Sequence, residues 1–373
     1  MIILGFLCTA PLLFYAGFLL RTAWFWSMIP RVPGEAGRLP SVSVILPARN
    51  EAARIEACVA AILHQDYPRD RYELVVVNDH SEDDTVNRAM AAAEGHPNFK
   101  VLDLEGGTGP AYKKAAVAHG VSESSGEIIV TMDADCVMGT GWLRTMAAAF
   151  DPETGLVSGP VVLEGRSVFE QFQALEFMGL IAVGAAGIAS GKPTMCNGAN
   201  LAYRRAVFAE VGGFGGIDHI ASGDDELLMH KIAAQTSHRI RFAKHRSAIV
   251  HSLAQPTWKG FWQQRIRWVS KRRHYHRAAI GWTMVLAYLA LLGFPLLAIA
   301  GLSDGRLWWF LGFNLLLKIG AEAAVLYPAA VFFDKLRLLW WLPLEQVPQI
   351  AYVLWLGIVG NRKQYEWKGR IVK

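Results

Sequence analysis

The chain has 373 residues, which is enough for one large domain or two modest ones. Hydrophobic residues make up 53% of it and charged residues only 18%, and the apolar excess lies at the two ends. The net charge of +5 is also local, because the stretch from Trp258 to Arg277 carries lysines and arginines but no acid. Beside apolar segments, such a patch indicates anionic lipid head groups or phosphates rather than nucleic acid. The cysteines are far apart, which indicates neither a disulfide framework nor a zinc site and fits a reducing, cytosolic location.

The amino-terminal segment is almost wholly apolar over residues 2–20, and Arg21 and Arg31 follow it. No basic residue precedes the run and no A-x-A site is evident, so residues 1–25 are expected to form a membrane anchor rather than a cleaved signal. The arginines that follow place its carboxyl end in the cytoplasm by the positive-inside rule. A Pro/Gly/Arg linker from Pro30 to Pro40 comes next.

The central part, residues 40–250, alternates between strand and helix patterns. Short apolar runs predict strands at 42–46, 72–77 and 99–103, a fourth strand that starts at Glu127 and ends in an acidic pair, and a last one at 239–243. Helical spacing predicts helices at 51–63, 85–94 and 113–119. This order implies βαβ units, hence an α/β domain with a mostly parallel sheet. Neither G-x-G-x-x-G nor G-K-[ST] follows the first strand, so the dinucleotide fingerprint and the P-loop are both absent from the sequence.

The fourth strand is expected to end in the acidic pair Asp133 and Asp135. On an extended chain the two carboxylates would point to the same side. Two hard oxygen donors suit Mg²⁺ or Mn²⁺, with diphosphate oxygens completing the shell. The alternative is a solvated acidic turn. Asp79 and Asp83 follow the second strand, where they could contact a base and a ribose, or serve only as turn and helix-cap residues.

The carboxyl-terminal part begins with a basic amphipathic segment, residues 255–278, expected to lie on the membrane surface. Three apolar stretches follow at about 279–302, 307–333 and 338–360, each long enough to span a bilayer. Lys318 and Glu322, four residues apart, are spaced to pair within the membrane or to face a cavity. Pro343 and Pro348 interrupt the third stretch, so two spans plus a re-entrant segment would keep the basic tail, residues 361–373, inside.

Seven short motifs occur in a fixed order along the chain. They are Pro47-Ala48-Arg49-Asn50-Glu51, Asn78-Asp79-His80-Ser81-Glu82-Asp83-Asp84-Thr85, Lys113-Lys114-Ala115-Ala116, Asp133-Ala134-Asp135, Asn197-Gly198-Ala199-Asn200, Ser222-Gly223-Asp224-Asp225-Glu226 and Gln264-Arg265-Ile266-Arg267-Trp268. The ordered set resembles the family-2 nucleotide-sugar glycosyltransferases of the GT-A fold. In particular, it resembles membrane-bound bacterial members related to cellulose, hyaluronan and poly-N-acetylglucosamine synthases. The resemblance covers roughly residues 40–280.

This resemblance implies roles for individual residues. Asp135, together with Asp133, would bind Mn²⁺ or Mg²⁺, and Asp224 would be the catalytic base, with Asp225 as the second choice. Gln264, Arg267 and Trp268 would close over the diphosphate and the acceptor end. The site for a nucleotide-sugar donor, usually a uridine diphosphate sugar, would be lined by Pro47, Arg49, Glu51, Asp79, Asp83, Lys113, Asp133, Asn197 and Gly198.

The chain departs from the family pattern in three places. The usual Asp-Asp pair after the second strand is Asn78-Asp79, and the glycine that usually precedes the lysine is Tyr112. The usual Glu-Asp pair reads Gly223-Asp224-Asp225-Glu226, which leaves the position of the base open by one residue. Without the resemblance, Arg267 and Trp268 would also be explained as membrane-interface anchors.

The resemblance, together with the apolar segments, implies an inverting, metal-dependent glycosyltransferase in the inner membrane, multi-pass and with its catalytic domain in the cytoplasm. Its partners would be a nucleotide-sugar donor, membrane lipids and a lipid or saccharide acceptor. The small number of spans favours a lipid-linked acceptor, whereas the Gln264–Trp268 motif favours a processive polysaccharide synthase. A catalytically silent nucleotide-sugar-binding scaffold is the alternative of another class. A transporter would need more polar residues in its spans than Lys318 and Glu322.

Overall fold

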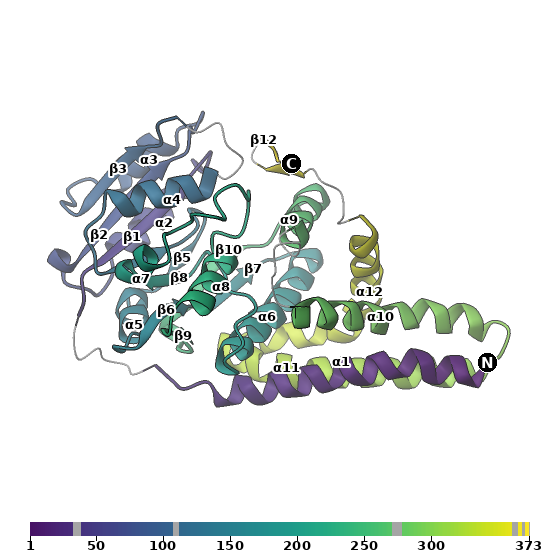
Figure 1. Ribbon diagram of the computed structural model, residues 1–373. Coiled ribbons are helices and arrows are strands. Elements are labelled where there is room, and N and C mark those ends of the chain that lie inside the picture. Colours follow the sequence, from purple (N-terminus) through teal and green to yellow (C-terminus); the bar gives the residue numbers. More distant parts are fainter. Residues whose placement is uncertain (33–38, 107–111, 271–277, 360–364, 368–369, 373) are drawn as a thin grey trace. The chain divides into compact units, whose positions relative to one another are not determined.

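The computed structural model describes residues 1–32, 39–106, 112–270, 278–359, 365–367 and 370–372 (Figure 1). The core of the expected linker, the cations at 271–277 and most of the basic tail lie outside these residues. The chain divides into two compact units. The sheet unit contains Ile29–Gly165, Gly187–Ala254 and Glu366–Lys373, and the helical unit contains Met1–Met28, Arg166–Ala186 and Gln255–Tyr365.

A seven-stranded sheet forms the centre of the sheet unit, and its strand order is β3-β2-β1-β4-β8-β6-β9. β1 pairs in parallel with β2 and β4, β2 with β3, and β6 with β9, whereas β8 is antiparallel to both of its neighbours. The strands span Val42–Ala48 (β1), Tyr72–Asn78 (β2), Phe99–Asp103 (β3), Ile128–Thr131 (β4), Thr154–Ser158 (β6), Leu201–Arg204 (β8) and Arg239–Phe242 (β9). The expected α/β fold with a mostly parallel sheet is thus confirmed.

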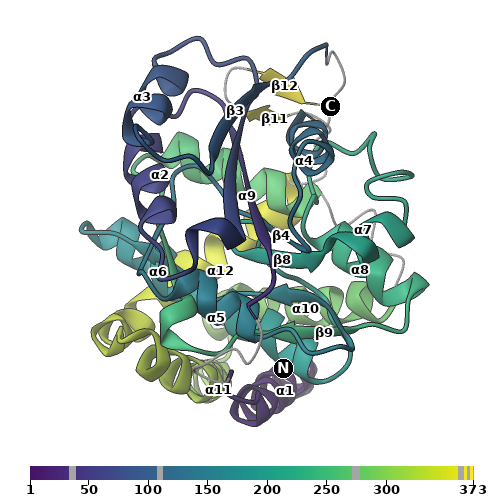
Figure 2. The same cartoon turned by 90° about the vertical axis from the view of Figure 1, so that its left-hand side faces the viewer.

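Helices cover the parallel part of this sheet on both faces. Right-handed crossovers place α2 and α3 on one face and α4 on the other, as Figure 2 shows. α4 lies close to β1 because Gly120 has no side chain: a Cβ there would stand 2.5 Å from Ile45 Cγ2. The helices of this unit are α2 (Ile55–Leu63), α3 (Thr85–Ala92), α4 (Tyr112–Ser122), α5 (Trp142–Ala148), α7 (Arg205–Glu210) and α8 (Glu226–Gln235), with the short 3-10 turns Arg69–Arg71 and Arg246–Ala248.

Two small sheets complete the strands. β5 (Val137–Met138), β10 (Val250–Leu253) and β7 (Val161–Glu164) form one, and β11 (Tyr365–Trp367) pairs with β12 (Arg370–Val372) in the other. The helix expected from Glu51 begins only at Ile55. The residues before it form a turn held by side chains of the next loop, because Thr85 Oγ1 accepts from the Glu51 N–H and Asp83 Oδ2 from the Ala52 N–H.

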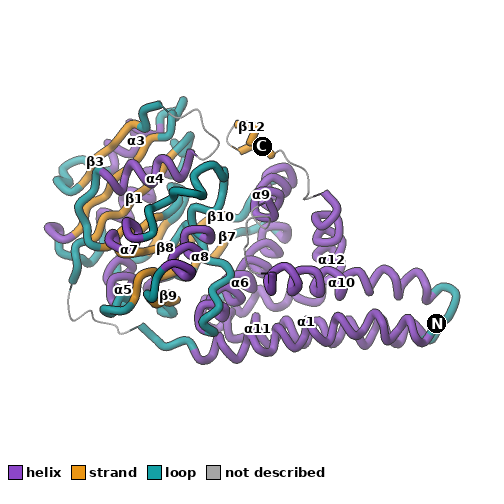
Figure 3. The backbone as a smooth tube through the Cα atoms, in the orientation of Figure 1, coloured by secondary structure: helices purple, strands orange, loops and turns teal. Residues whose placement is uncertain are grey.

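The helical unit contains long apolar helices, several of which run side by side (Figure 3). α1 packs along α10 and α11, with Leu12 buried against Ala290 and Phe294. The helices are α1 (Ile2–Met28), α6 (Val168–Ala189), α9 (Trp258–Ser270), α10 (Ala278–Gly301), α11 (Leu307–Phe333) and α12 (Leu342–Val359), with the 3-10 helix η4 (Leu336–Trp341) before the last. α12 continues through Pro348, so the expected break falls earlier, at η4.

Five helical segments among the described residues are long and apolar enough to cross a membrane: Ile2–Met28, Val168–Ala189, Gly281–Gly301, Leu307–Phe333 and Leu336–Val359. The second of these is α6, which lies between strands of one sheet. β6 precedes it and β8 follows it, and the two strands pair with each other. If α6 crossed a bilayer, residues 190–200 would have to cross back without helical hydrogen bonding, which lipid does not tolerate. The topology therefore requires both ends of α6 to be on the same side.

A fully buried lysine connects two of the long helices. Lys318 Nζ lies 2.7 Å from Glu322 Oε1 on α11, and 2.7 Å and 2.6 Å from the amide oxygens of Gln346 and Gln349 on α12. The Tyr15 hydroxyl of α1 donates to the same Glu322 oxygen at 2.9 Å. The expected pairing of Lys318 with Glu322 is confirmed.

We expect Lys318→Met to lower the free energy of unfolding by about 2 kcal/mol, because Glu322 would remain buried without its cation and two amides would lose their donor. Thermal unfolding of the purified protein in detergent measures this loss. The double variant Lys318→Met, Glu322→Gln should recover part of it, since no uncompensated carboxylate remains. If Lys318→Met were as stable as the wild type, the contacts of Lys318 would not contribute to the free energy of unfolding.

Candidate functional site

The parallel strands β2, β1 and β4 end at the same edge of the sheet, and each is followed by a polar loop. The strand order reverses at this point, because the chain moves from β1 outwards to β3 and then returns to β4 on the other side of β1. Open α/β sheets bind ligands at such a switch point. The loops that follow β1, β2 and β4 carry most of the residues singled out in the sequence.

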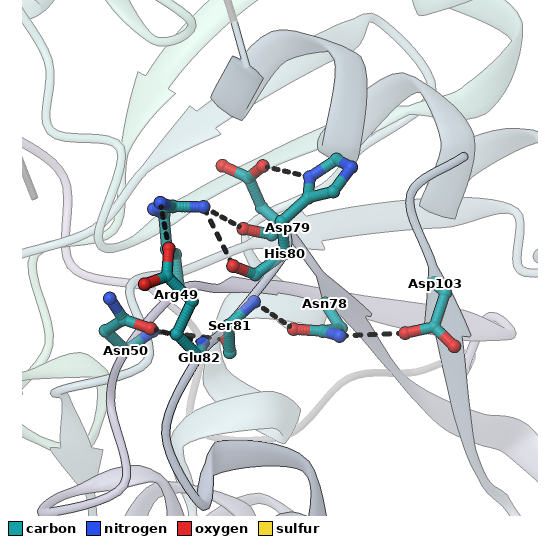
Figure 4. A network of polar contacts seen from close by, with 8 residues as sticks. All are labelled: Arg49, Asn50, Asn78, Asp79, His80, Ser81, Glu82 and Asp103. Atoms are coloured by element: carbon teal, nitrogen blue, oxygen red, sulfur yellow. Dashed lines mark hydrogen bonds and ion pairs between the residues drawn. The ribbon is translucent and has the colours of Figure 1, made fainter. Parts of the chain in front are cut away.

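Arg49 joins the first two loops, as Figure 4 shows. Its Nη1 donates to the carbonyl oxygens of Asp79 at 2.9 Å and of His80 at 2.8 Å, and its guanidinium is 3.3 Å from Glu82. Asp79 is almost fully buried, and its carboxylate lies 3.1 Å from His80 Nδ1. Arg49 therefore fixes the backbone that carries Asp79. This structural role does not depend on any contact between Arg49 and a ligand.

Asn78, which replaces the usual acid, also has a structural explanation (Figure 4). Its amide oxygen accepts from the Ser81 N–H at 3.0 Å, and its amide nitrogen donates to Asp103 Oδ1 at 2.8 Å. An aspartate at this position would bring a second negative charge against Asp103 and would have no proton to donate. The asparagine thus follows from the neighbouring strand β3.

Asp83 is tied to its own loop. Its Oδ1 accepts from the backbone N–H and the hydroxyl of Thr85, and its Oδ2 accepts from the Ala52 N–H. Although desolvation opposes ionisation, these hydrogen bonds hold the pKa of the carboxyl below its usual value. These contacts correspond to the turn-and-cap alternative for Asp83, and its role at a ribose stays a prediction.

The acidic pair lies in a turn and not on the strand, because β4 already ends at Thr131. The expectation that Asp133 and Asp135 point to the same side rested on an extended strand and does not apply to a turn. The two carboxylates also have different partners. Asp133 Oδ1 is 2.7 Å from Lys113 Nζ, whereas Asp135 Oδ2 is 3.3 Å from Arg54 Nη1. The Asp133 side chain is 45% exposed and that of Asp135 is 23% exposed, so both can be reached from solvent.

Lys113 links this turn to the acid near the start of α8. Its ammonium lies 2.7 Å from Asp133 Oδ1 and 2.9 Å from Asp224 Oδ2. Burial alone would lower the pKa of Lys113, but the carboxylates of Asp133 and Asp224 outweigh it and raise the pKa well above its usual value. Gly198 makes room for the pair, since a Cβ there would stand 3.2 Å from Asp224 Oδ2 and 3.3 Å from Lys113 Nζ.

The two neighbouring acids have different surroundings. Both oxygens of Asp225 accept backbone hydrogen bonds, one from the Gly198 N–H at 3.0 Å and one from the Glu226 N–H at 2.7 Å, where it caps α8. Asp224 instead reaches Lys113. The geometry favours Asp224 as the acid that faces the site and gives Asp225 the task of holding α8 against the turn that contains Gly198.

The remaining residues that the sequence singled out are placed as follows. Asn197 closes the turn before β8, with its Oδ1 accepting from the Ala199 N–H at 2.8 Å. Pro47 lies in β1 opposite Val77, and Glu51 follows β1 in its exit loop. Gln264, Arg267 and Trp268 lie on α9 in the helical unit, where the Trp268 ring is 5.9 Å from that of Phe177 and 4.4 Å from the Arg265 guanidinium. Their closure over a donor stays a prediction.

Among the described residues, the carboxylates of Asp133 and Asp135 are candidates for holding a metal at this edge. Two thiols are close by, since Cys136 Sγ is 3.5 Å from Asp135 Oδ1 and Cys58 Sγ is 3.8 Å from the Asp133 carbonyl. Burial, with the charge of Asp135 adding to it, raises the pKa of both thiols. The carboxylates of Asp133 and Asp135 fit a hard divalent cation that takes its other ligands from a diphosphate.

Two further residues near this edge, His251 and Lys114, are not marked as functional by any pattern in the sequence. His251 on β10 is paired opposite Val137, two residues after Asp135, and its Nδ1 lies 2.9 Å from Glu164 Oε1. A lone histidine in a short strand gives no signal until the pairing of β5 and β10 is known. Lys114 is the second of these residues. It stands in the same motif as Lys113, but the resemblance implies a role for Lys113 alone.

Two protein families and several known proteins that are similar to this chain are glycosyltransferases by name. The family described as Glycosyl transferase family 2 matches residues 43–212, and Glycosyl transferase family group 2 matches residues 128–332, more than half of the chain. The probable glycosyltransferase YdaM of Bacillus subtilis is 29% identical over 246 residues, which are 64% of this chain and 57% of that protein. Glycosyltransferase AglE of Haloferax volcanii is 31% identical over 209 residues, 55% of this chain and 65% of that one.

A further relative is the poly-beta-1,6-N-acetyl-D-glucosamine synthase of Staphylococcus epidermidis, 24% identical over 246 residues, 64% of this chain and 56% of that one. This chain therefore aligns with less than two thirds of the length of these relatives. Among solved structures, the mannosyltransferase PcManGT from Pyrobaculum calidifontis, in complex with GDP-Man and Mn²⁺, has a TM-score of 0.62 at 22% identity, covering 94% of this chain and 99% of that one. This likeness supports the GT-A fold. The family matches show that the chain belongs to the family-2 glycosyltransferases.

Proposed function

We propose that the protein is an inverting, metal-dependent glycosyltransferase that moves a sugar from a nucleotide diphosphate sugar to a lipid or lipid-linked acceptor at the cytoplasmic face of the inner membrane. One observation supports this proposal more than any other. Lys113 is ion-paired to Asp133 and to Asp224 at once, which brings the acidic turn and the candidate base into one cluster at the switch point of the sheet.

In this proposal the Asp224 carboxylate takes the proton of an acceptor hydroxyl as its oxygen attacks the anomeric carbon. The new carbon–oxygen bond forms on one face of the sugar while the bond to the diphosphate breaks on the other, and the nucleoside diphosphate leaves. A divalent metal held by Asp135 and Asp133 would supply positive charge to the leaving diphosphate. Asp79, presented by the loop that Arg49 fixes, would contact the nucleoside, and Lys113 would approach the phosphates.

The membrane side of the proposal rests on connectivity. Because α6 has both ends on one side, α1, α10, α11 and α12 remain as candidate spans. The final segment, Glu366–Lys373, belongs to the same compact unit as the sheet. With the tail on the catalytic side, α10 and α11 would cross the membrane and α12 would return to the side where it started. This arrangement agrees with the positive-inside rule for the basic tail.

A processive polysaccharide synthase is the second candidate, and the name of the Staphylococcus epidermidis relative supports it. A lipid acceptor is supported by the name of another relative, the beta-monoglucosyldiacylglycerol synthase of Trichormus variabilis, which is 30% identical over 118 residues, 31% of this chain and 25% of that protein. Product length distinguishes the two candidates, because a processive enzyme builds chains from one acceptor.

The direct test is nucleotide diphosphate release by detergent-purified protein supplied with native lipids, Mn²⁺ or Mg²⁺, and a panel containing UDP-glucose, UDP-N-acetylglucosamine and GDP-mannose. We expect one donor to be turned over with metal and none with EDTA. Mass spectrometry of the lipid product would show one added sugar for single transfer or a ladder for a synthase. Binding of a donor without turnover of any in the panel would favour the silent scaffold instead.

A further inference from the structure

Two consecutive lysines on α4 send their ammonium groups to different parts of the site. Lys113 reaches the carboxylates of Asp133 and Asp224. Lys114 is 2% exposed, and its Nζ donates to two backbone carbonyls, those of Ile220 at 2.5 Å and Ser222 at 2.8 Å. Ser222 directly precedes Gly223 and Asp224 in the chain, and Ile220 lies two residues before Ser222. Lys113 therefore contacts the side chain of Asp224, the candidate base, whereas Lys114 contacts the backbone just before Asp224.

The segment that carries Asp224 has little regular structure of its own. Between α7 and α8 it runs from 211 to 225 as turns and bends. Its backbone hydrogen bonds are local, such as those from Gly215 to Gly212 and from Ile220 to Ile217. Glycines with positive φ recur along it, ending with Gly223 at +86°. A segment of this kind depends on contacts from outside to keep one conformation.

Lysine side chains hold this segment at both ends. Lys231 on α8 donates to the carbonyls of Gly213 at 2.9 Å and Gly215 at 2.6 Å near its beginning. Lys114 does the same near its end, through Ile220 and Ser222. Only the second pair of contacts adjoins Asp224. Gly223 lies between these contacts and Asp224, whose other neighbour, Asp225, is held by the Gly198 and Glu226 N–H groups. Without the Lys114 contacts, the permissive backbone of Gly223 would let Asp224 shift on its amino-terminal side.

We propose that Lys114 is a positioning residue for glycosyl transfer: it fixes the backbone from which Asp224 projects, so that the carboxylate stays beside Lys113 and in line with the acceptor hydroxyl. This inference rests on the proposed role of Asp224 as the base. A displacement of about 1 Å at a catalytic group can cost about 10²-fold in rate, so a tether of two hydrogen bonds can control turnover without touching the substrate.

The test compares Lys114→Met with Lys231→Met in the full-length protein in detergent. Both variants remove a lysine that bonds two carbonyls of the same segment, but only the first loosens the end next to Asp224. We expect Lys114→Met to lower kcat by about 10- to 100-fold, with KM for the donor and Kd for the nucleoside diphosphate changed by less than about twofold. Lys231→Met should lower Tm comparably and kcat by less than about threefold. Lys114→Arg, which keeps donors for both carbonyls, should recover part of the lost kcat.

Asp224→Asn belongs in the same series, because it separates failure of this inference from failure of the proposed function. If Lys114 acts through Asp224, adding Lys114→Met to Asp224→Asn should lower the residual rate no further. An equal loss in both backgrounds, an unchanged kcat in Lys114→Met, or an equal loss of kcat in Lys231→Met would overturn the positioning role. A fully active Asp224→Asn would instead overturn the assignment of the base.

Discussion

Replacing Asp224 by asparagine is expected to lower the rate of transfer by about 10²–10⁴-fold, the range that a positioned general base contributes. The amide keeps the size of the side chain but cannot accept the proton of the acceptor hydroxyl. Loss of its charge also releases Lys113, which then has Asp133 as its remaining carboxylate partner in the cluster. Donor binding should persist, so the loss should appear in kcat and not in Kd for the nucleotide.

Asp225→Asn is the matched control, because it makes the same chemical change one residue along. Asp225 accepts from the Gly198 and Glu226 N–H groups with its two oxygens, and an amide can satisfy only one of them. We expect a loss of about 1 kcal/mol in the free energy of unfolding and a smaller effect on the rate. Kinetics of nucleotide release and thermal unfolding measure both quantities. A severe loss of rate in Asp225→Asn with a mild one in Asp224→Asn would show that the base had been placed one residue too early.

Much of this site could be predicted from the sequence because its strands are short apolar runs that end in polar loops. β1 and β2 are buried along nearly their whole length, so hydrophobicity alone marks them and thereby locates Asp79 and Glu51. The ordered motifs then supplied Lys113, Asp133 and Asp224. Local sequence patterns were therefore sufficient to predict those parts of the site that depend only on residues close together in the chain.

What could not be predicted depends on pairings that are distant in the sequence. β8 is four residues long and lies antiparallel between β4 and β6. Its composition does not indicate this position in the sheet. The constraint on α6 follows only from that pairing, since by length and composition the helix qualifies as a span. The same holds for Asn78, which makes sense only beside Asp103 on β3, and for Lys114, whose partners lie more than 100 residues away.

A second large effect is expected at the acidic turn. Asp135→Asn should lower metal-dependent turnover by about 10²–10³-fold, because a neutral amide oxygen binds a hard divalent cation far more weakly than a carboxylate does. More metal should be needed for half-maximal activity. The same shift should appear in calorimetric titration of Mn²⁺ into protein with bound nucleoside diphosphate, a readout that does not require turnover.

Arg54 provides a control of opposite sign. Its Nη1 lies 3.3 Å from Asp135 Oδ2 and competes for the oxygen that a cation would use. Arg54→Gln should therefore leave the metal requirement unchanged or bring half-maximal activity to a lower metal concentration. If Asp135→Asn titrated with Mn²⁺ as the wild type does while Asp133→Asn did not, the metal would be held by the residue that Lys113 now contacts. Donor and metal binding would then have to displace Lys113 from Asp133, and its ion pair with Asp224 would be the contact that remains during transfer.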